Sequence, residues 1–183
     1  MESLAGQFLI STPQMPDPRF QEQVIYICAH NEAGAMGLAV NNPNPHLTLT
    51  DILLGANLAV PAGLPAPVYI GGPVEMEAGF VLFRAESCAH YAMEIQPGIF
   101  VSRDSRLLED IAKGEGPDEF LFLLGYAGWG AGQLENELLD NGWLVVPADM
   151  EVIFRAPVEE RWKKAAGSFG IDITQLGDII GNA

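Results

Sequence analysis

Short apolar runs separated by glycine, proline and polar residues dominate the hydrophobic pattern of this chain. Such runs predict short strands, whereas apolar residues three or four positions apart predict helices. We expect strands at residues 8–10, 24–30, 35–41, 68–70, 79–85, 91–95, 99–101, 120–124, 143–146 and 152–154. We expect helices at residues 48–54, 104–113, 133–140 and 157–169.

The order of these elements indicates the fold class. About ten short strands and four or five short helices do not strictly alternate, which favours an α+β fold over a doubly wound sheet. Residues 24–41 predict a hairpin, and residues 79–101 predict a meander. With 183 residues and nearly half of them apolar, we expect residues 1–183 to form a single domain with a sizeable core.

The chain is organised around residues 120–147. Five consecutive apolar residues, 120–124, predict a strand covered on both faces. Four glycines follow within eight positions and predict a loop, and good helix-forming sequence begins at Gln133. The glycines indicate either a functional loop or a tight packing corner around Tyr126 and Trp129, and the sequence leaves both interpretations open.

A glycine loop before a helix also suggests phosphate binding, but the sequence argues against it. Gly125 and Gly130 have the spacing of a P-loop, yet no lysine follows them, and Gln133 replaces the third glycine of a dinucleotide fingerprint. Glu135 and Glu137 would repel a phosphate at the start of this helix. We therefore expect no nucleotide site here.

Charge further restricts the class of partner. The chain has 24 acidic and 9 basic residues, a net charge of −15, and no basic residue in the range 20–83. Such a protein is repelled by nucleic acids and anionic membranes, so we expect no direct binding to either. The one basic cluster predicts salt bridges within a helix, Glu159 with Lys163 and Glu160 with Lys164.

The sequence also predicts a cytoplasmic location. Residues 1–11 lack the basic and apolar segments of a signal peptide. Residues 52–74 carry no charge, but Pro61, Pro65 and Pro67 interrupt them, which argues against a membrane helix. Two cysteines without a secretory signal indicate a reducing compartment.

Several motifs together resemble one known family. They are Gly6-Gln7-Phe8-Leu9-Ile10, Asp17-Pro18-Arg19-Phe20, His30-Asn31, Gly34-Ala35-Met36-Gly37-Leu38, Gly71-Gly72-Pro73-Val74, Leu124-Gly125-Tyr126-Ala127-Gly128-Trp129 and Gly132-Gln133-Leu134-Glu135. Over essentially the whole chain, they resemble the AlgH/YqgE family. The resemblance implies a bacterial cytosolic protein with a mixed, barrel-like β structure and a regulatory role in transcription, without a settled biochemical activity. No helix-turn-helix or basic recognition helix accompanies it, so we expect any effect on transcription to be indirect.

Three positions depart from the family pattern. Asn42 stands where an arginine is usual, and Phe83 and Asn182 each replace a histidine. The resemblance therefore assigns no role to these three side chains.

Polar and glycine-flanked positions near predicted strand ends provide the candidate site. Turns at strand ends often gather into one cleft, so we expect a cleft that binds a protein or a small ligand. The candidates are Asn41, Gly72, Pro73, Glu75, Tyr126, Gly128, Trp129, Gln133 and Glu135. An equally weighted alternative is that Gln133 and Glu135 cap local backbone groups and that Asn41 forms a turn hydrogen bond.

The sequence contains no recognised catalytic motif. A nucleophile elbow, Cys-x-x-Cys and His-Glu-x-x-His are all absent, and we assign no catalytic residue and no cofactor. We expect a regulatory or adaptor protein that binds an unidentified protein or small molecule. The alternative is a small-molecule enzyme, such as a hydrolase, that uses the same cleft.

A repeated tripeptide suggests a metal site, which we weigh as the weaker interpretation. Cys28-Ala29-His30 and Cys88-Ala89-His90 contain the ligand types of a zinc site. Their spacing is shorter than structural zinc sites use, and a cysteine in a strand commonly packs as a small apolar residue. We therefore expect neither a metal nor a disulfide.

Overall fold

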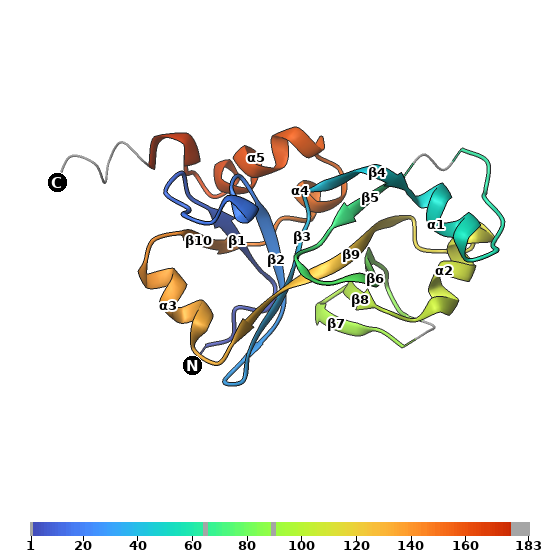
Figure 1. Ribbon diagram of the computed structural model, residues 1–183, viewed down its shortest axis with the longest axis horizontal. Helices are drawn as coiled ribbons and strands as arrows, with labels where there is room; N and C mark the ends of the chain where they lie inside the picture. Colours follow the sequence, from blue (N-terminus) through green and yellow to red (C-terminus); the bar gives the residue numbers. More distant parts are fainter. Residues whose placement is uncertain (1, 64–65, 89–90, 177–183) are drawn as a thin grey trace.

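The computed structural model of the protein describes residues 2–63, 66–88 and 91–176 (Figure 1). Over these residues the fold is α+β, with ten strands and five α-helices, as predicted. The strands are β1 (Gln7–Ser11), β2 (Val24–Asn31), β3 (Gly34–Ala39), β4 (Pro43–Thr48), β5 (Pro67–Ile70), β6 (Val74–Arg84), β7 (Met93–Gln96), β8 (Ile99–Ser102), β9 (Glu119–Gly130) and β10 (Trp143–Pro147). The helices are α1 (Leu49–Gly55), α2 (Ser105–Ala112), α3 (Gln133–Leu139), α4 (Met150–Phe154) and α5 (Arg161–Gly167), with short 3-10 turns η1 (Pro18–Phe20), η2 (Val158–Glu160) and η3 (Ile173–Gln175).

All ten strands belong to one mixed sheet that curls into a half-barrel. The main order is β10-β1-β2-β3-β9-β6-β8-β7, with antiparallel neighbours. β5 pairs with β9 in parallel and with β4 in antiparallel orientation, which makes the sheet mixed. The predicted barrel-like β structure is therefore confirmed.

β9 differs most from the prediction, because the expected glycine loop is part of the strand. β9 continues through the glycines to Gly130 and crosses the molecule from the side of α3 to the side of α1 and α2 (Figure 1). Its first half pairs with β5 and β6, and its second half pairs with β3. Gly125, with φ of 74°, lies where the partners change. The loop prediction was wrong because pairing with neighbouring strands outweighs the low strand propensity of glycine.

The connection between β5 and β6 explains two more glycines. A Cβ added at Gly71 would lie 2.3 Å from the carbonyl oxygen of Gly125, and one at Gly72 would lie 2.1 Å from the carbonyl carbon of Tyr126. These are backbone atoms, which cannot move aside as a flexible side chain can. The glycines therefore let this connection pass directly against β9.

Two other expectations need correction. Residues 152–154 lie in α4, where the Asp149 side chain accepts a hydrogen bond from the Glu151 N–H and caps the helix. A three-residue apolar run is compatible with either a strand or a buried helix. The Asp149 cap favours the helix, because it provides an acceptor for a backbone N–H at the helix start. The predicted meander has a different order, because β8 lies between β6 and β7.

The last predicted helix is divided into η2 and α5. Trp162 and Ala165 are buried as expected, whereas Phe169 lies beyond α5 and is 58% exposed. The Glu160–Lys164 ion pair is present at 2.8 Å. The other predicted pair, Glu159 with Lys163, is not among the ion pairs of the described residues. None of the helices in these residues has the length and apolar character to cross a membrane.

The buried Arg161 joins α5 to the sheet. Its Nη1 donates to the carbonyl oxygen of Val40 at 2.6 Å and to the Tyr69 hydroxyl at 3.1 Å, and its Nε donates to the carbonyl oxygen of Ala156 at 3.0 Å. No carboxylate pairs with it among the residues that the structure describes. This side chain is only 4% exposed, so carbonyl and hydroxyl oxygens take the place of water around its charge. The sequence interpretation, which assigned the basic cluster to salt bridges within a helix, missed this role.

Candidate functional site

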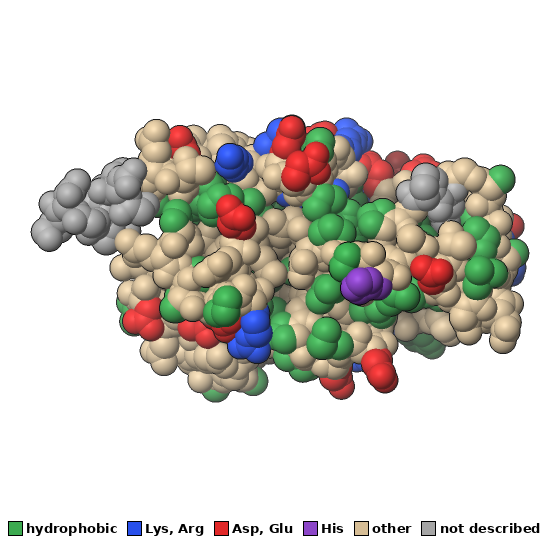
Figure 2. Space-filling view, turned by 45° about the horizontal axis from the view of Figure 1, so that its top comes forward, with side chains coloured by type: hydrophobic (Ala, Val, Ile, Leu, Met, Phe, Trp, Pro, Cys, Tyr) green, Lys and Arg blue, Asp and Glu red, His purple; other side chains and the backbone are tan. Residues whose placement is uncertain are grey.

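A pocket of about 310 Å³ lies between η1, the second half of β9 and the helix α3. Apolar side chains form much of its wall, and four charged side chains also line it. We call it the tryptophan pocket and define it by its main lining residues, which are Asp17, Arg19, Phe20, Pro73, Val74, Gly128, Trp129, Gln133, Glu137, Asp140 and Trp143. The face drawn in Figure 2 exposes hydrophobic side chains in several places, with acidic and basic side chains between them.

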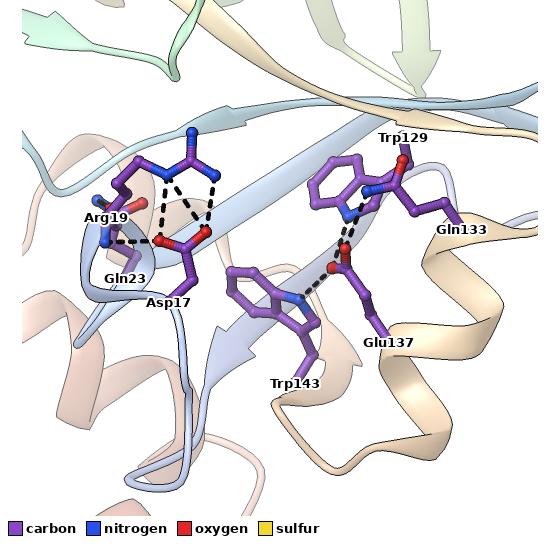
Figure 3. Close-up of polar contacts among 7 residues, drawn as sticks. All are labelled: Asp17, Arg19, Gln23, Trp129, Gln133, Glu137 and Trp143. Atoms are coloured by element: carbon purple, nitrogen blue, oxygen red, sulfur yellow. Dashed lines mark hydrogen bonds and ion pairs between the residues drawn. The ribbon is translucent and has the colours of Figure 1, made fainter.

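The carboxylate of Glu137 is the polar centre of the tryptophan pocket (Figure 3). Its Oε2 accepts hydrogen bonds from the indole Nε1 of Trp129 at 2.9 Å and of Trp143 at 3.0 Å. Its Oε1 accepts a hydrogen bond from Nε2 of Gln133 at 3.1 Å. Three donors from β9, α3 and β10 thus fix this carboxylate in one orientation.

The local sequence explains how α3 brings these groups together. Gln133 and Glu137 are four residues apart and so lie on one face of the helix. The N–H of Gly130 donates to Oε1 of Gln133 at 3.0 Å, which requires the amide nitrogen to face Glu137. Gly132, with φ of 72°, makes the turn from β9 into α3, and the buried Leu134 holds the helix against the core.

Asp17 and Arg19 form the opposite wall of the pocket, as Figure 3 shows. Nη2 of Arg19 lies 2.7 Å from Oδ2 of Asp17, and Nε contacts both carboxylate oxygens. Asp17 also caps η1 by accepting the N–H of Arg19. These hydrogen bonds lower the pKa of Asp17 and raise the pKa of Arg19. The charge of the Arg19 guanidinium is thus already neutralised by the Asp17 carboxylate at the start of the same turn.

Four of the nine candidate residues line the tryptophan pocket: Pro73, Gly128, Trp129 and Gln133. The first two provide backbone and small apolar surface. Trp129 and Gln133 belong to the hydrogen-bond network of Glu137. The structure therefore brings part of the predicted site together.

Glu75 and Tyr126 line a second, more open groove of about 560 Å³. Gly128 and Trp129 border both hollows, so the second half of β9 separates them. Glu75 has φ of 45°, an unusual backbone conformation for a residue with a side chain. These two candidates thus lie beside the tryptophan pocket and not in it.

The remaining candidates make structural contacts outside the pocket. The side chain of Asn41 accepts the N–H of Val24 and donates to the carbonyl oxygen of Glu22, both at 2.9 Å. These partners lie 17 and 19 residues earlier in the chain, so the hydrogen bonds join Asn41 to the start of β2 and are not the turn hydrogen bond that the alternative interpretation predicts. Gly72 makes the close approach to β9 described above. Glu135 points to His30 and lies outside the residues that line either hollow.

His30 and Glu135 form a clasp at the end of α3. The His30 side chain is 2% exposed, its Nδ1 accepts the N–H of Leu4 at 3.0 Å, and its Nε2 lies 2.6 Å from Oε1 of Glu135. The neutral imidazole therefore carries its proton on Nε2 and donates it to the carboxylate. Hydrogen bonds from its own backbone N–H and from His30 lower the pKa of Glu135.

The sequence interpretation missed Asp17, Arg19, Glu137 and Trp143 as site residues. Two signals were available for them. Glu137 shares a helix face with Gln133, and the Asp17-Pro18-Arg19-Phe20 motif belongs to the family resemblance. What the sequence does not contain is the long-range pairing that places these segments opposite each other.

The two cysteine tripeptides form no metal site within the residues that the structure describes. Cys28 is 3% exposed, its thiol contacts the carbonyl oxygen of Tyr26, and burial raises its pKa. Ala89 and His90 of the second tripeptide lie outside the described residues. Within the residues that are described, no three His, Cys, Asp or Glu side chains are placed to hold a metal ion.

The structure shows the contacts of two of the three residues that depart from the family pattern. Phe83 is 2% exposed and stacks on Phe100 with ring centroids 5.5 Å apart. The carbonyl oxygen of Asn42 accepts the N–H of Ile70 at 2.7 Å. Asn182 lies outside the described residues.

Comparison with known proteins gives consistent matches over the chain. The sequence model of the AlgH-like family matches residues 8–174. A UPF0301 protein of Desulfotalea psychrophila is 47% identical over 181 residues, which cover 99% of this chain and 95% of that protein. The solution structure of the AlgH protein from Pseudomonas aeruginosa is 41% identical, with a TM-score of 0.79 and coverage of 96% of this chain and 93% of that one. A crystal structure of a Corynebacterium diphtheriae protein, at 20% identity and a TM-score of 0.76, covers 95% of this chain and 91% of that one and shows the fold alone.

Proposed function

The chain belongs to the AlgH-like family, and from this premise we propose that it is a cytoplasmic regulatory or adaptor protein that acts by binding a ligand in the tryptophan pocket. The family resemblance supports the regulatory part of the proposal. The pocket supports the binding part, since its volume of about 310 Å³ falls in the range of small-ligand sites.

The observation that carries the proposal is the hydrogen-bond network of Glu137. Two indole nitrogens and one amide converge on a carboxylate that borders a cavity, and they come from three different elements. Apolar walls with a few fixed polar groups are typical of binding sites, because the walls provide affinity and the polar groups provide orientation. The acidic surface supports an effect on transcription through a bound ligand or partner, and not through DNA.

The three tryptophans allow a direct test by NMR. Each indole N–H gives a separate signal, and Trp129 and Trp143 report on the pocket. Trp162 is an internal control because it donates to the carbonyl oxygen of Ser11 elsewhere in the core. We expect the small-molecule fraction of a soluble cell extract to shift the Trp129 and Trp143 signals and to leave the Trp162 signal in place. If neither pocket signal moves with the small-molecule fraction or with the protein fraction, the proposal is wrong.

A matched pair of variants on α3 connects binding to regulation. Glu137→Gln removes the charge from the tryptophan pocket, whereas Glu135→Gln makes the same change outside its lining. In a deletion strain, we expect wild type and Glu135→Gln to restore the transcript profile and Glu137→Gln to leave it altered. Full restoration by Glu137→Gln would refute a regulatory role for the pocket.

A further inference from the structure

The charges around the tryptophan pocket indicate which ligands it favours. Three carboxylates, those of Asp17, Glu137 and Asp140, line it against the single guanidinium of Arg19, which leaves a local net charge of −2. Arg19 is engaged by Asp17 through three hydrogen bonds. An anionic ligand would therefore meet unbalanced negative charge, whereas a cation would be attracted.

The hydrogen bonds of Glu137 further restrict the class of ligand that the pocket can bind. A carboxylate offers about four acceptor positions, and here both indoles occupy Oε2 and an amide occupies one position on Oε1. The remaining capacity suits a single N–H donor. Hard divalent metal ions require six or more oxygen ligands, or a near-ideal octahedron, and this arrangement does not offer them.

The aromatic walls of the pocket also favour an organic cation. The rings of Phe20, Trp129 and Trp143 line the cavity and pack edge to face, with centroids 5.8 Å apart for the first and third and 6.4 Å apart for the two tryptophans. Arg19 already lies over Phe20, with 5.4 Å between its guanidinium carbon and the ring centroid. Aromatic rings attract organic cations and also accommodate their alkyl parts, which a neutral polar wall would not do.

We propose that the tryptophan pocket binds an organic monocation, an alkylammonium or alkylguanidinium group, whose N–H donates to Glu137 and whose alkyl part packs on Trp129 and Trp143. This inference rests on the function proposed above and specifies its ligand class. The same chemical group occurs on free amines and on lysine and arginine side chains. The test therefore includes both sources.

The test titrates four probes with the same five-carbon chain into the protein and follows the indole signals by NMR. Pentylamine and pentylguanidine are cations, pentanol is neutral and pentanoate is an anion. We expect the cations to shift the Trp129 and Trp143 signals with at least tenfold lower Kd than pentanol, and pentanoate to cause no shift. A capped tripeptide with a central lysine, compared with one that has a central leucine, tests the protein-borne source. A response to either the free cations or the lysine peptide supports the inference.

Variants provide the control for charge. We expect Glu137→Gln to weaken cation binding at least tenfold and Glu135→Gln to leave it unchanged. If Glu137→Gln does not fold, Asp140→Asn takes its place in the test, because Asp140 is exposed and also lines the pocket. We expect Asp140→Asn to weaken cation binding severalfold and to leave pentanol binding unchanged. If pentanol or pentanoate binds as well as the cations, or if no cation binds, the inference is overturned. The function proposed above would still stand if an extract fraction shifts the pocket signals, so the two failures are distinguishable.

Discussion

Replacement of Arg161 by methionine should destabilise the protein strongly, although the residue lies in a cluster of basic side chains. The substitution keeps much of the apolar stem and removes the donors that serve the carbonyl oxygens of Val40 and Ala156 and the hydroxyl of Tyr69. Each lost hydrogen bond from a charged group costs about 1.5–3 kcal/mol, offset in part because a buried charge no longer needs desolvation. We expect a net loss of about 3 kcal/mol in the free energy of unfolding, a large part of the ~5–15 kcal/mol typical of a domain.

Urea unfolding followed by circular dichroism measures this loss. With a slope of roughly 2 kcal/mol per molar urea, the expected midpoint shift is about 1.5 M. Arg155→Met is the matched control, because Arg155 is 55% exposed and its ion pairs with Glu119 and Glu151 lie at the surface, where such pairs contribute little to stability. If Arg161→Met costs no more than Arg155→Met, the guanidinium does not hold α5 to the sheet and the reasoning is refuted.

Three further predictions concern other parts of the molecule. Gly72→Ala should lower the melting temperature markedly or prevent folding, because its Cβ would meet backbone at 2.1 Å, whereas Gly55→Ala, with open space around it, should not. Glu135 has a lowered pKa in the folded protein, so its stabilising contribution is present above the ordinary glutamate pKa of about 4.3 and is lost as the pH falls through the lower folded value. The difference in melting temperature between wild type and Glu135→Gln should therefore be larger at neutral pH than in strong acid; an equal difference would contradict the clasp. In a Cys88→Ser variant, Cys28 should react with a thiol reagent only as fast as the protein opens, since burial raises its pKa, and prompt reaction of the native protein would contradict this.

Much of the fold follows from local signals that the sequence contains. Thr48 forms a capping box with Asp51 before α1, and Asp104 caps α2 by accepting the Arg106 N–H. The hairpin of β2 and β3 follows from two apolar runs around a turn. In these cases the residues that determine the element lie within it or next to it.

The site could be predicted only in part, because its residues meet through contacts between distant segments. Trp129 and Gln133 were expected, since both lie near the glycine-rich end of β9. Arg19 lies more than a hundred residues earlier in the chain and reaches the pocket only through the pairing of β1 with β10 and β2. The extension of β9 beyond Gly125 has the same origin, because it depends on pairing with β3 and not on the glycines themselves.

The position of β9 in the chain has a consequence for synthesis on the ribosome. β3, β5 and β6 are all translated before β9, and in the described residues each has one edge that pairs with β9. At about 5–20 residues per second, the ribosome needs on the order of ten seconds to reach Gly130. Until then, these unpaired edges are open to pairing with other chains. A nascent chain stalled before β9 should therefore depend on chaperones far more than one released just after β10.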